Sequence, residues 1–386
     1  MAASFSSLAL TQVLPFLPLT QGDIDYQSER RADPNLIAEV LAQPKTTVVF
    51  VRDGLIAVPD GQAARVDYET AKIRLAEVPG EYVLRALAEE SNDGVGSQAQ
   101  ANEVSANQGS ANENNPASGN VISRAASRFG LIPIFLGNYG VGSEHPQSVV
   151  ALDVSGFAKK TSAGGDLLKN QVLERALQRF DWVSLLGFAP HASAREAGQA
   201  TTAVALSNWH NSQKYCPRCG SPVRSAMAGW AQQCSNESCE AHKSLLFPRI
   251  EPAVITSIVD GQGRLLLQHN KKWNDPSFYS VCAGFVEAGE NLEHAVKREA
   301  AEETGLTLGE VKYLGSQPWP FPASLMVAFK ARALGGDVKV DGCETLDARF
   351  FTRDEFADAL SAGRIKQPGK ATVARYMIEE WYGQKL

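Results

Sequence analysis

The stretch from Gly284 to Leu306 holds the residue types most able to do chemistry in this chain. It reads Gly-Phe-Val-Glu-Ala-Gly-Glu-Asn-Leu-Glu-His-Ala-Val-Lys-Arg-Glu-Ala-Ala-Glu-Glu-Thr-Gly-Leu. On a helix, residues three and four apart share a face, so Glu299 projects beside Glu302 and Glu303, and such like charges repel by about a few tenths of a kcal/mol per pair. A bound divalent cation would offset this repulsion, because Mg²⁺ takes carboxylate oxygens and keeps waters for substrate phosphates.

A second group consists of cysteines with the spacing C-x2-C-x14-C-x4-C, namely Cys216, Cys219, Cys234 and Cys239. Two close cysteine pairs on turns can place four thiolates tetrahedrally around one Zn²⁺, and four thiolates leave no open position for catalysis. The spacing therefore predicts a structural zinc, with Gly220 giving one turn its backbone freedom. A pair of disulfides is the rival interpretation, and a nucleic-acid-binding ribbon is the functional alternative, given the nearby basic residues Lys214, Arg218, Arg224 and Lys243.

The elements around the acidic stretch are predicted from their periodicity. Strands are expected at 253–259, 264–269 and 279–283, the last leading into Gly284. Apolar residues at helical spacing (Leu292, Ala295, Val296 and Ala300) predict a helix whose apolar face packs on a sheet, with Gly305 ending it. Further strands are expected at 311–315, 325–331 and 348–351, and helices at 354–361 and 371–381.

The N-terminal half has no evident catalytic group and predicts a mostly β domain. Strand-like runs lie at 46–51, 55–58, 131–136 and 147–154, and helical segments at 168–180 and 192–209. Between about 90 and 120 the chain is rich in Ser, Asn, Gly, Gln, Ala and Glu. Such a segment buries too little apolar surface to offset chain entropy, so a disordered insert is expected there.

Composition is that of a multi-domain soluble enzyme of 386 residues, with 44% hydrophobic and 21% charged residues. A net charge of −6 gives no basic footprint for non-specific nucleic-acid binding. No apolar run approaches the roughly 20 residues of a membrane span. Six cysteines without a secretory signal indicate a reducing compartment, the cytoplasm. The ending Gln384-Lys385-Leu386 is near the peroxisomal Ser-Lys-Leu address and departs from it at one residue.

The segment Ser316-Gln317-Pro318-Trp319-Pro320-Phe321-Pro322-Ala323-Ser324 is predicted to be a proline-stiffened loop. Its aromatic residues could stack on a nucleobase or nicotinamide, or could belong to the core of a structural turn.

Gly284, Glu290 and the run from Arg298 to Leu306 together resemble the box of the Nudix hydrolase family. With the four cysteines and the 316–324 segment, the chain resembles the NADH pyrophosphatase branch from about Gln213 onward. The resemblance implies a catalytic Nudix domain of α/β/α sandwich type at 248–386. A zinc ribbon at 211–247 and a mostly β, Nudix-like N-terminal domain at 1–210 would precede it, in a homodimer.

The resemblance also implies roles for individual residues. Divalent ions, two or three Mg²⁺ or Mn²⁺, would be held by the carbonyl of Ala283 and by Glu299, Glu303 and Glu344. Glu302 would act as base or as a ligand through water. Four residues would hold the loop geometry, namely Gly284, Glu290, Arg298 and Gly305. Substrate contacts would come from Phe247, Gln317, Pro318, Trp319, Pro320, Phe321, Pro322, Ala323, Ser324 and Ala374. Phe247 stands where the family usually has tyrosine, so stacking is kept and a hydroxyl is lost.

The expected reaction is hydrolysis of the pyrophosphate of NADH, and less well NAD⁺, to the nicotinamide mononucleotide and AMP. Three alternatives stay open: removal of NAD caps from RNA 5′ ends, hydrolysis of a broader set of nucleoside diphosphates linked to another group, and a non-catalytic zinc-ribbon module with a decayed box. An assay with NADH and Mg²⁺ separates the last from the others.

Overall fold

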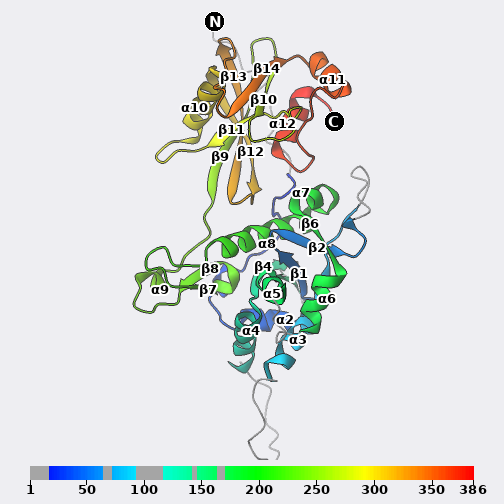
Figure 1. Cartoon of the computed structure of the whole chain (residues 1–386), viewed down its shortest axis with the longest axis vertical. Coiled ribbons are helices and arrows are strands. Elements are labelled where there is room, and N and C mark those ends of the chain that lie inside the picture. The colour runs from blue at the N-terminus through cyan, green and yellow to red at the C-terminus, as the bar shows by residue number, and fades with distance from the viewer. Residues whose placement is uncertain (1–16, 64–71, 93–115, 141–145, 163–169) are drawn as a thin grey trace, which may run out of the picture. The chain divides into compact units, whose positions relative to one another are not determined.

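The structure, a computed structural model of the chain, describes residues 17–63, 72–92, 116–140, 146–162 and 170–386 (Figure 1). The chain divides into two compact units. The described residues up to Thr20 join Arg249–Leu386 in a C-terminal unit, and Gln21–Pro248 form an N-terminal unit that includes the four-cysteine segment. No described helix has both the length and the apolar character needed to cross a membrane.

The C-terminal unit is built on a mixed sheet in the order β12-β13-β9-β10-β14, with β11 added on β9. Its strands are β9 (Glu251–Val259), β10 (Leu265–Asn270), β11 (Cys282–Phe285), β12 (Thr307–Trp319), β13 (Ser324–Gly335) and β14 (Thr345–Phe351). β13 runs parallel to β9, and the other pairings are antiparallel. A strand is present at each predicted place, and four of the six are longer than predicted. The strand predicted at 279–283 is shorter, since β11 begins at Cys282 and ends at Phe285.

Helices cover both faces of this sheet: α10 (Leu292–Thr304) lies on one side, and α11 (Arg353–Ser361) and α12 (Val373–Tyr382) lie on the other (Figure 1). Successive strand residues point to opposite faces, so Val254 and Leu266 pack with α10, whereas Ile255 and Leu265 pack with α11 and α12. The predicted α/β/α sandwich is confirmed.

The N-terminal unit contains a second six-stranded sheet, in the order β4-β5-β1-β2-β6 with β3 added on β1. Its strands are β1 (Thr47–Arg52), β2 (Leu55–Pro59), β3 (Glu77–Pro79), β4 (Ile132–Tyr139), β5 (Gln147–Asp153) and β6 (Phe180–Ser184). Here β5 runs parallel to β1, and the other pairings are antiparallel. The two sheets therefore have the same topology, strand for strand, which supports the expected Nudix-like N-terminal domain.

Helices complete the N-terminal unit. They are η1 (Ser28–Arg30), α2 (Leu36–Leu41), α3 (Gly80–Asn92), α4 (Pro116–Phe129), α5 (Ser155–Ser162), α6 (Gln171–Arg179), α7 (Leu185–Phe188), η3 (Ala189–His191) and α8 (Ala194–Ser212). One apolar core joins β1 and β5 to α2, α3, α4 and α6. α8 contributes nothing to that core and packs on β1, β2, β4 and β5.

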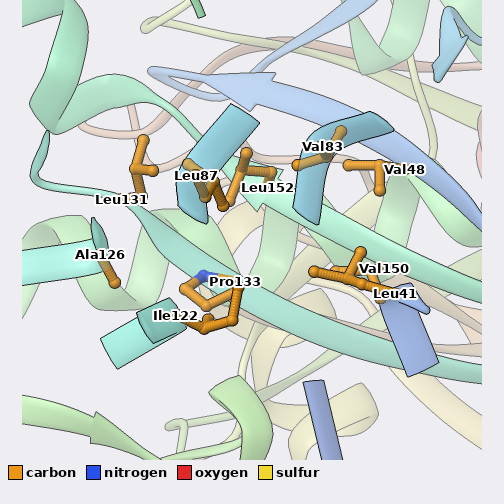
Figure 2. A pocket seen from close by; sticks show the side chains of 10 residues that line it. All are labelled: Leu41, Val48, Val83, Leu87, Ile122, Ala126, Leu131, Pro133, Val150 and Leu152. Carbon is orange, nitrogen blue, oxygen red and sulfur yellow. The ribbon is translucent and has the colours of Figure 1, made fainter. Parts of the chain in front are cut away.

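A small void lies within this core, among apolar side chains that include Leu87, Ile122 and Leu152 (Figure 2). Its volume is about 10 Å³, near the minimum for one water, and its lining side chains offer a water no polar partner. It is a packing imperfection rather than a binding site.

The predicted disordered insert at about 90–120 is wrong at both ends. Residues 90–92 belong to α3 and residues 116–120 to α4, while residues 93–115 lie outside the described part. Pro116 stands at the start of α4, where its missing N–H costs nothing. Ile122, Ala125 and Phe129 follow at helical spacing and are buried in the core, so the apolar face of α4 stabilises the helix.

The predicted loop at 316–324 is also largely wrong. Residues up to Trp319 belong to β12, and Ser324 already begins β13, so only four residues form the turn. Pro318 stands opposite Leu325 within the ladder. Strand pairing thus overrides the local preference of the prolines for irregular backbone.

The four cysteines belong to a small hairpin of β7 (Val223–Ala226) and β8 (Ala231–Cys234), with η4 (Met227–Gly229) between them and α9 (Glu240–Ser244) after. The side chains of Trp230 and His210 connect this hairpin to the rest of the N-terminal unit. Trp230 donates from Nε1 to the carbonyl of Phe135 at 2.7 Å. His210, at the end of α8, is 3.1 Å from Nε2 of Gln232 through Nδ1 and 2.9 Å from the carbonyl of Gly229 through Nε2.

These two contacts fit a neutral imidazole that donates from Nε2 and accepts at Nδ1, and burial lowers the pKa of His210. Below about pH 6.5, His210 therefore binds a proton in the unfolded chain but stays neutral in the folded unit. We expect the free energy of unfolding to fall between pH 7.5 and 5.5 by about 1 kcal/mol through this residue. Urea titrations of the native protein and of His210→Gln measure it. An identical pH dependence in both proteins would contradict the assignment.

Candidate active site

Gly284 lies directly beside the carboxylate of Glu299. Gly284 lies on β11 opposite Val254 of β9, and Glu299 lies on α10. A Cβ at position 284 would be 1.9 Å from Cδ of Glu299 and 2.1 Å and 2.3 Å from its two oxygens. Only glycine leaves room for this carboxylate against the strand. Burial raises the pKa of Glu299, Arg298 lowers it, and the charges of Glu303 and Glu302 raise it further.

Glu303 is the most deeply buried carboxylate of the cluster, with 4% of its surface exposed. Its oxygens accept from Nε2 of Gln268 at 2.8 Å, from Sγ of Cys282 at 3.2 Å and from Oγ1 of Thr345 at 3.2 Å. Burial raises the pKa of Glu303, these hydrogen bonds lower it, and the charge of Glu344 raises it. None of its partners among the described residues is cationic. Buried charges are normally paired or bind metals, so this carboxylate suits a divalent cation.

Arg298 organises the outer side of the cluster. It donates to both oxygens of Glu290 at 2.9 Å and to the carbonyl of Phe285 at 2.8 Å, which holds the loop between β11 and α10. The Arg298 guanidinium lowers the pKa of Glu290 to about 2. Arg298 also lies 3.0 Å from Glu299 and 2.9 Å from Glu302.

Glu302 and Glu344 are more exposed than Glu299, which is half-buried, and Glu303, which is buried. The side chain of Glu302 is 61% exposed and paired with Arg298. Glu344 is exposed, in the turn before β14, where Asp341 accepts from the backbone N–H groups of Glu344 and Thr345. Ala283 pairs with Ile255 in the sheet, next to Gly284.

Gly305 ends α10 as predicted. Its φ of 70° is left-handed, and its N–H donates to the carbonyl of Ala301.

The four cysteines are ready for a tetrahedral ion. All four are free thiols, and their sulfur atoms lie within 4.8 Å of one another. Two of the separations are 3.9 Å (Cys216 to Cys239) and 3.5 Å (Cys219 to Cys234). A Zn–S bond of 2.3 Å in tetrahedral geometry needs sulfur atoms about 3.8 Å apart. The rival disulfides are absent among these described residues. Within the part of the chain that the structure describes, no cluster of glutamates has its ligand oxygens within 4.8 Å of one another.

Details around this ribbon agree with a structural role. Hydrogen bonds from Ser221 lower the pKa of Cys219 to about 6, which favours the thiolate there, whereas burial raises the pKa of Cys234 to about 12. His242 contacts the carbonyl of Cys234 at 2.8 Å through Nδ1 and stays outside the ligand set. Gly220 has a φ of 72°, the left-handed backbone expected of it.

The predicted substrate residues fall into distinct groups. Gln317 is completely buried and its amide is used internally, by Pro18, Ala371 and Val373, at 2.7 to 2.8 Å. No group on it is left for a ligand, so its visible role is to hold the start of α12. Trp319 and Phe321 pack edge to face, 5.0 Å between ring centroids, and Phe321 is 37% exposed.

Five of the remaining predicted substrate residues lie in or beside the turn between β12 and β13, and two lie elsewhere in the chain. Pro320 and Ser324 are buried, Pro318 and Ala323 are half-buried, and Pro322 is exposed. Ala374 is buried in the first turn of α12. Phe247 is 63% exposed and belongs to the N-terminal unit.

Three residues that support Glu303 were missed from the sequence, namely Gln268, Cys282 and Thr345. One of them carried a usable signal. Leu266 of β10 faces the core under α10, and Gln268 follows two residues later on the same face. A glutamine at a core-facing strand position needs a buried polar partner, which here is Glu303.

Comparison with known proteins agrees with this geometry. The family model described as NUDIX domain matches residues 249–372, and the model described as NADH pyrophosphatase zinc ribbon domain matches residues 211–242. The chain carries a Nudix domain. The matched region contains Gly284, the acidic helix, the sheet and α11, and it ends just before α12. The zinc-ribbon match contains all four cysteines.

Curated relatives cover part of the chain. A protein named NAD-capped RNA hydrolase NudC, from Mycobacterium bovis, is 43% identical over 192 residues, which are 47% of this chain and 59% of that protein. The human protein named NAD-capped RNA hydrolase NUDT12 is 35% identical over 193 residues, or 48% and 42% of the two chains. The chain thus spans about half the length of the curated relatives it matches. A solved NUDIX hydrolase from Nitrosomonas europaea has 22% identity and a TM-score of 0.35, covering 45% of this chain and 95% of that one.

Replacing Gly284 with alanine tests the contact with Glu299. The added methyl group would displace the carboxylate of Glu299. If that carboxylate binds the metal, we expect affinity for Mn²⁺ to fall about tenfold or more. Mn²⁺ titration followed by electron paramagnetic resonance measures this. Gly369→Ala is the matched control, because a methyl group added at Gly369 would have no other atom within 4 Å. Equal affinity in both variants would refute the role of Gly284.

Loss of zinc should destabilise the N-terminal unit, because structural zinc contributes folding free energy directly. Cys234→Ser should lower bound zinc, measured by mass spectrometry, and also lower the melting temperature. Cys343→Ser is the control, because Cys343 is an exposed thiol outside the set. An unchanged melting temperature after zinc extraction would argue against a structural ion.

Proposed function

We propose that this protein hydrolyses the pyrophosphate bond of NADH and NAD⁺ to the nicotinamide mononucleotide and AMP. The observation that supports this most is the pair of carboxylates Glu299 and Glu303 on one helix beside a strand glycine. Glu299 is half-buried, and Glu303 is buried without any described cationic partner. The matched NADH pyrophosphatase zinc ribbon directs the choice of substrate class. The curated relatives described above are named NAD-capped RNA hydrolases. An NAD cap and a free nicotinamide dinucleotide share the same chemical group, so these names favour a substrate that carries it.

In this proposal Glu299, Glu303, Glu344 and the carbonyl of Ala283 would hold the divalent ions. When bound, Mg²⁺ or Mn²⁺ would neutralise the negative charge of the pyrophosphate oxygens and lower the pKa of a bound water. The chain's own contribution is positioning. Gln268 and Thr345 orient the two oxygens of Glu303, and Arg298 fixes the loop that follows β11 through Glu290.

The proton released by the attacking water needs a carboxylate to accept it. Glu302 is our proposed acceptor, and its exposure leaves it free to move once it leaves Arg298. Comparing Glu302→Gln with Glu303→Gln separates the roles, since loss of a base changes the pH dependence of turnover, whereas loss of a ligand changes the metal dependence.

Removal of NAD caps from RNA is the second candidate, favoured by the names of the relatives. Exposed Tyr215 and Lys243 on the ribbon are residue types that contact single-stranded RNA. A homodimer in a reducing compartment, the cytoplasm, completes the proposal.

A substrate panel tests the assignment. NADH, NAD⁺, ADP-ribose and an NAD-capped RNA would be compared in single-turnover assays with Mg²⁺ and with Mn²⁺, and the products identified by mass. Preferential release of nicotinamide mononucleotide and AMP from the free dinucleotides supports the first candidate. Faster turnover of capped RNA supports the second, and no turnover of any of them refutes both.

Replacing Glu303 with glutamine keeps the side-chain shape and removes its charge. We expect turnover of NADH at saturating Mg²⁺ to fall roughly a hundredfold or more, with the circular dichroism spectrum unchanged. Glu293→Gln, an exposed change on the same helix, is the control and should retain activity. Retained activity in Glu303→Gln would sink the metal-ligand assignment.

A further inference from the structure

The N-terminal unit contains a cavity of about 130 Å³ that the proposed reaction does not use. It is lined by side chains of β1, β3, α3, α6 and β6. Three of these are aromatic: Phe50 and Phe180, whose ring centroids are 5.8 Å apart, and Tyr82, which is 42% exposed. All lining residues lie within the described part of the chain.

The position of this cavity in the fold is informative. The two sheets share one topology, in which β3 corresponds to β11 and β6 to β14. In the C-terminal unit the acidic cluster comes from the helix after β11 and from the residue just before β14. The cavity is lined by Tyr82 of the helix after β3 and by Arg179, the residue just before β6. It therefore occupies the topological position that the catalytic site has in the Nudix domain.

The charged side chains that line the cavity are both basic. They are Arg175 and Arg179, one turn apart on the exposed side of α6. Neither arginine forms an ion pair with any described residue, and no acidic side chain lines the cavity. A site of this charge would attract an anion directly, whereas the glutamate site needs a cation between itself and a phosphate.

Size and lining narrow the occupant. A closed apolar cavity of about 150 Å³ accepts a benzene molecule, so this cavity of about 130 Å³ matches the size of one aromatic ring. Aromatic rings stack on Phe or Tyr, and arginines bind phosphate. We infer that the N-terminal unit binds a phosphate ester of a single-ring aromatic group, such as a pyrimidine nucleoside monophosphate, with the ring in the cavity and the phosphate on Arg175 and Arg179. This site does not depend on the proposed activity.

Isothermal titration of the full chain with uridine 5′-monophosphate, without added divalent cations, tests the proposal. We expect one site per chain and binding at least tenfold weaker for uridine, which lacks the phosphate, and for inorganic phosphate, which lacks the ring. The double variant Arg175→Ala/Arg179→Ala should weaken binding tenfold or more. Gln178→Ala, on the same helix and outside the lining, is the matched control and should bind as the native protein does.

A second variant tests the cavity itself. Ala176→Leu would fill part of it, because Ala176 lines the cavity and is 3% exposed, and binding should be lost while the melting temperature shows a folded protein. No detectable binding to the native protein, or equal binding to the native protein and the double arginine variant, would overturn the proposal. Equal affinity for phosphate and for the nucleotide would overturn the assignment of the aromatic group.

Discussion

The acidic site depends on the burial of a carboxylate among neutral donors. Glu303 loses most of its hydration and recovers three hydrogen bonds, none of which supplies a positive charge. Glu299 stands one turn earlier against a glycine, and its one described cation, Arg298, is shared with Glu290 and Glu302. A helix in this state is short of positive charge on its sheet-facing side. β10, β11 and β14 supply the neutral donors Gln268, Cys282 and Thr345, and these do not provide the missing positive charge.

The repeated topology suggests a binding role for the N-terminal unit in addition to its support of the four-cysteine hairpin. Both units place a helix after the strand that joins the central strand of the sheet, and both present the segment before the last strand to the same region. In the C-terminal unit Glu344 immediately precedes the last strand, and in the N-terminal unit Arg179 does. The fold thus sets where a site forms, while the side chains set the charge of what it attracts.

The sequence predicted the architecture well where periodicity was strong. The strands and helices after residue 250, the C-terminal stop at Gly305 and the zinc-ready cysteines all followed from local pattern. It failed where tertiary packing decided the outcome. Pro318 is part of the ladder between β12 and β13. The prolines of this segment had predicted a loop instead. Gln317 is saturated by backbone groups from two distant segments, and no local signal reports that.

Leu17 and Pro18 have a consequence for how the Nudix domain folds. Leu17 is buried in the core with α12, and Pro18 accepts from Gln317, yet more than two hundred residues of the other unit separate them from β9 in the chain. During synthesis this N-terminal piece must wait for its partners until the ribosome has made the rest. A fragment starting at Arg249 would lack it, leaving an apolar groove and one amide proton unsatisfied.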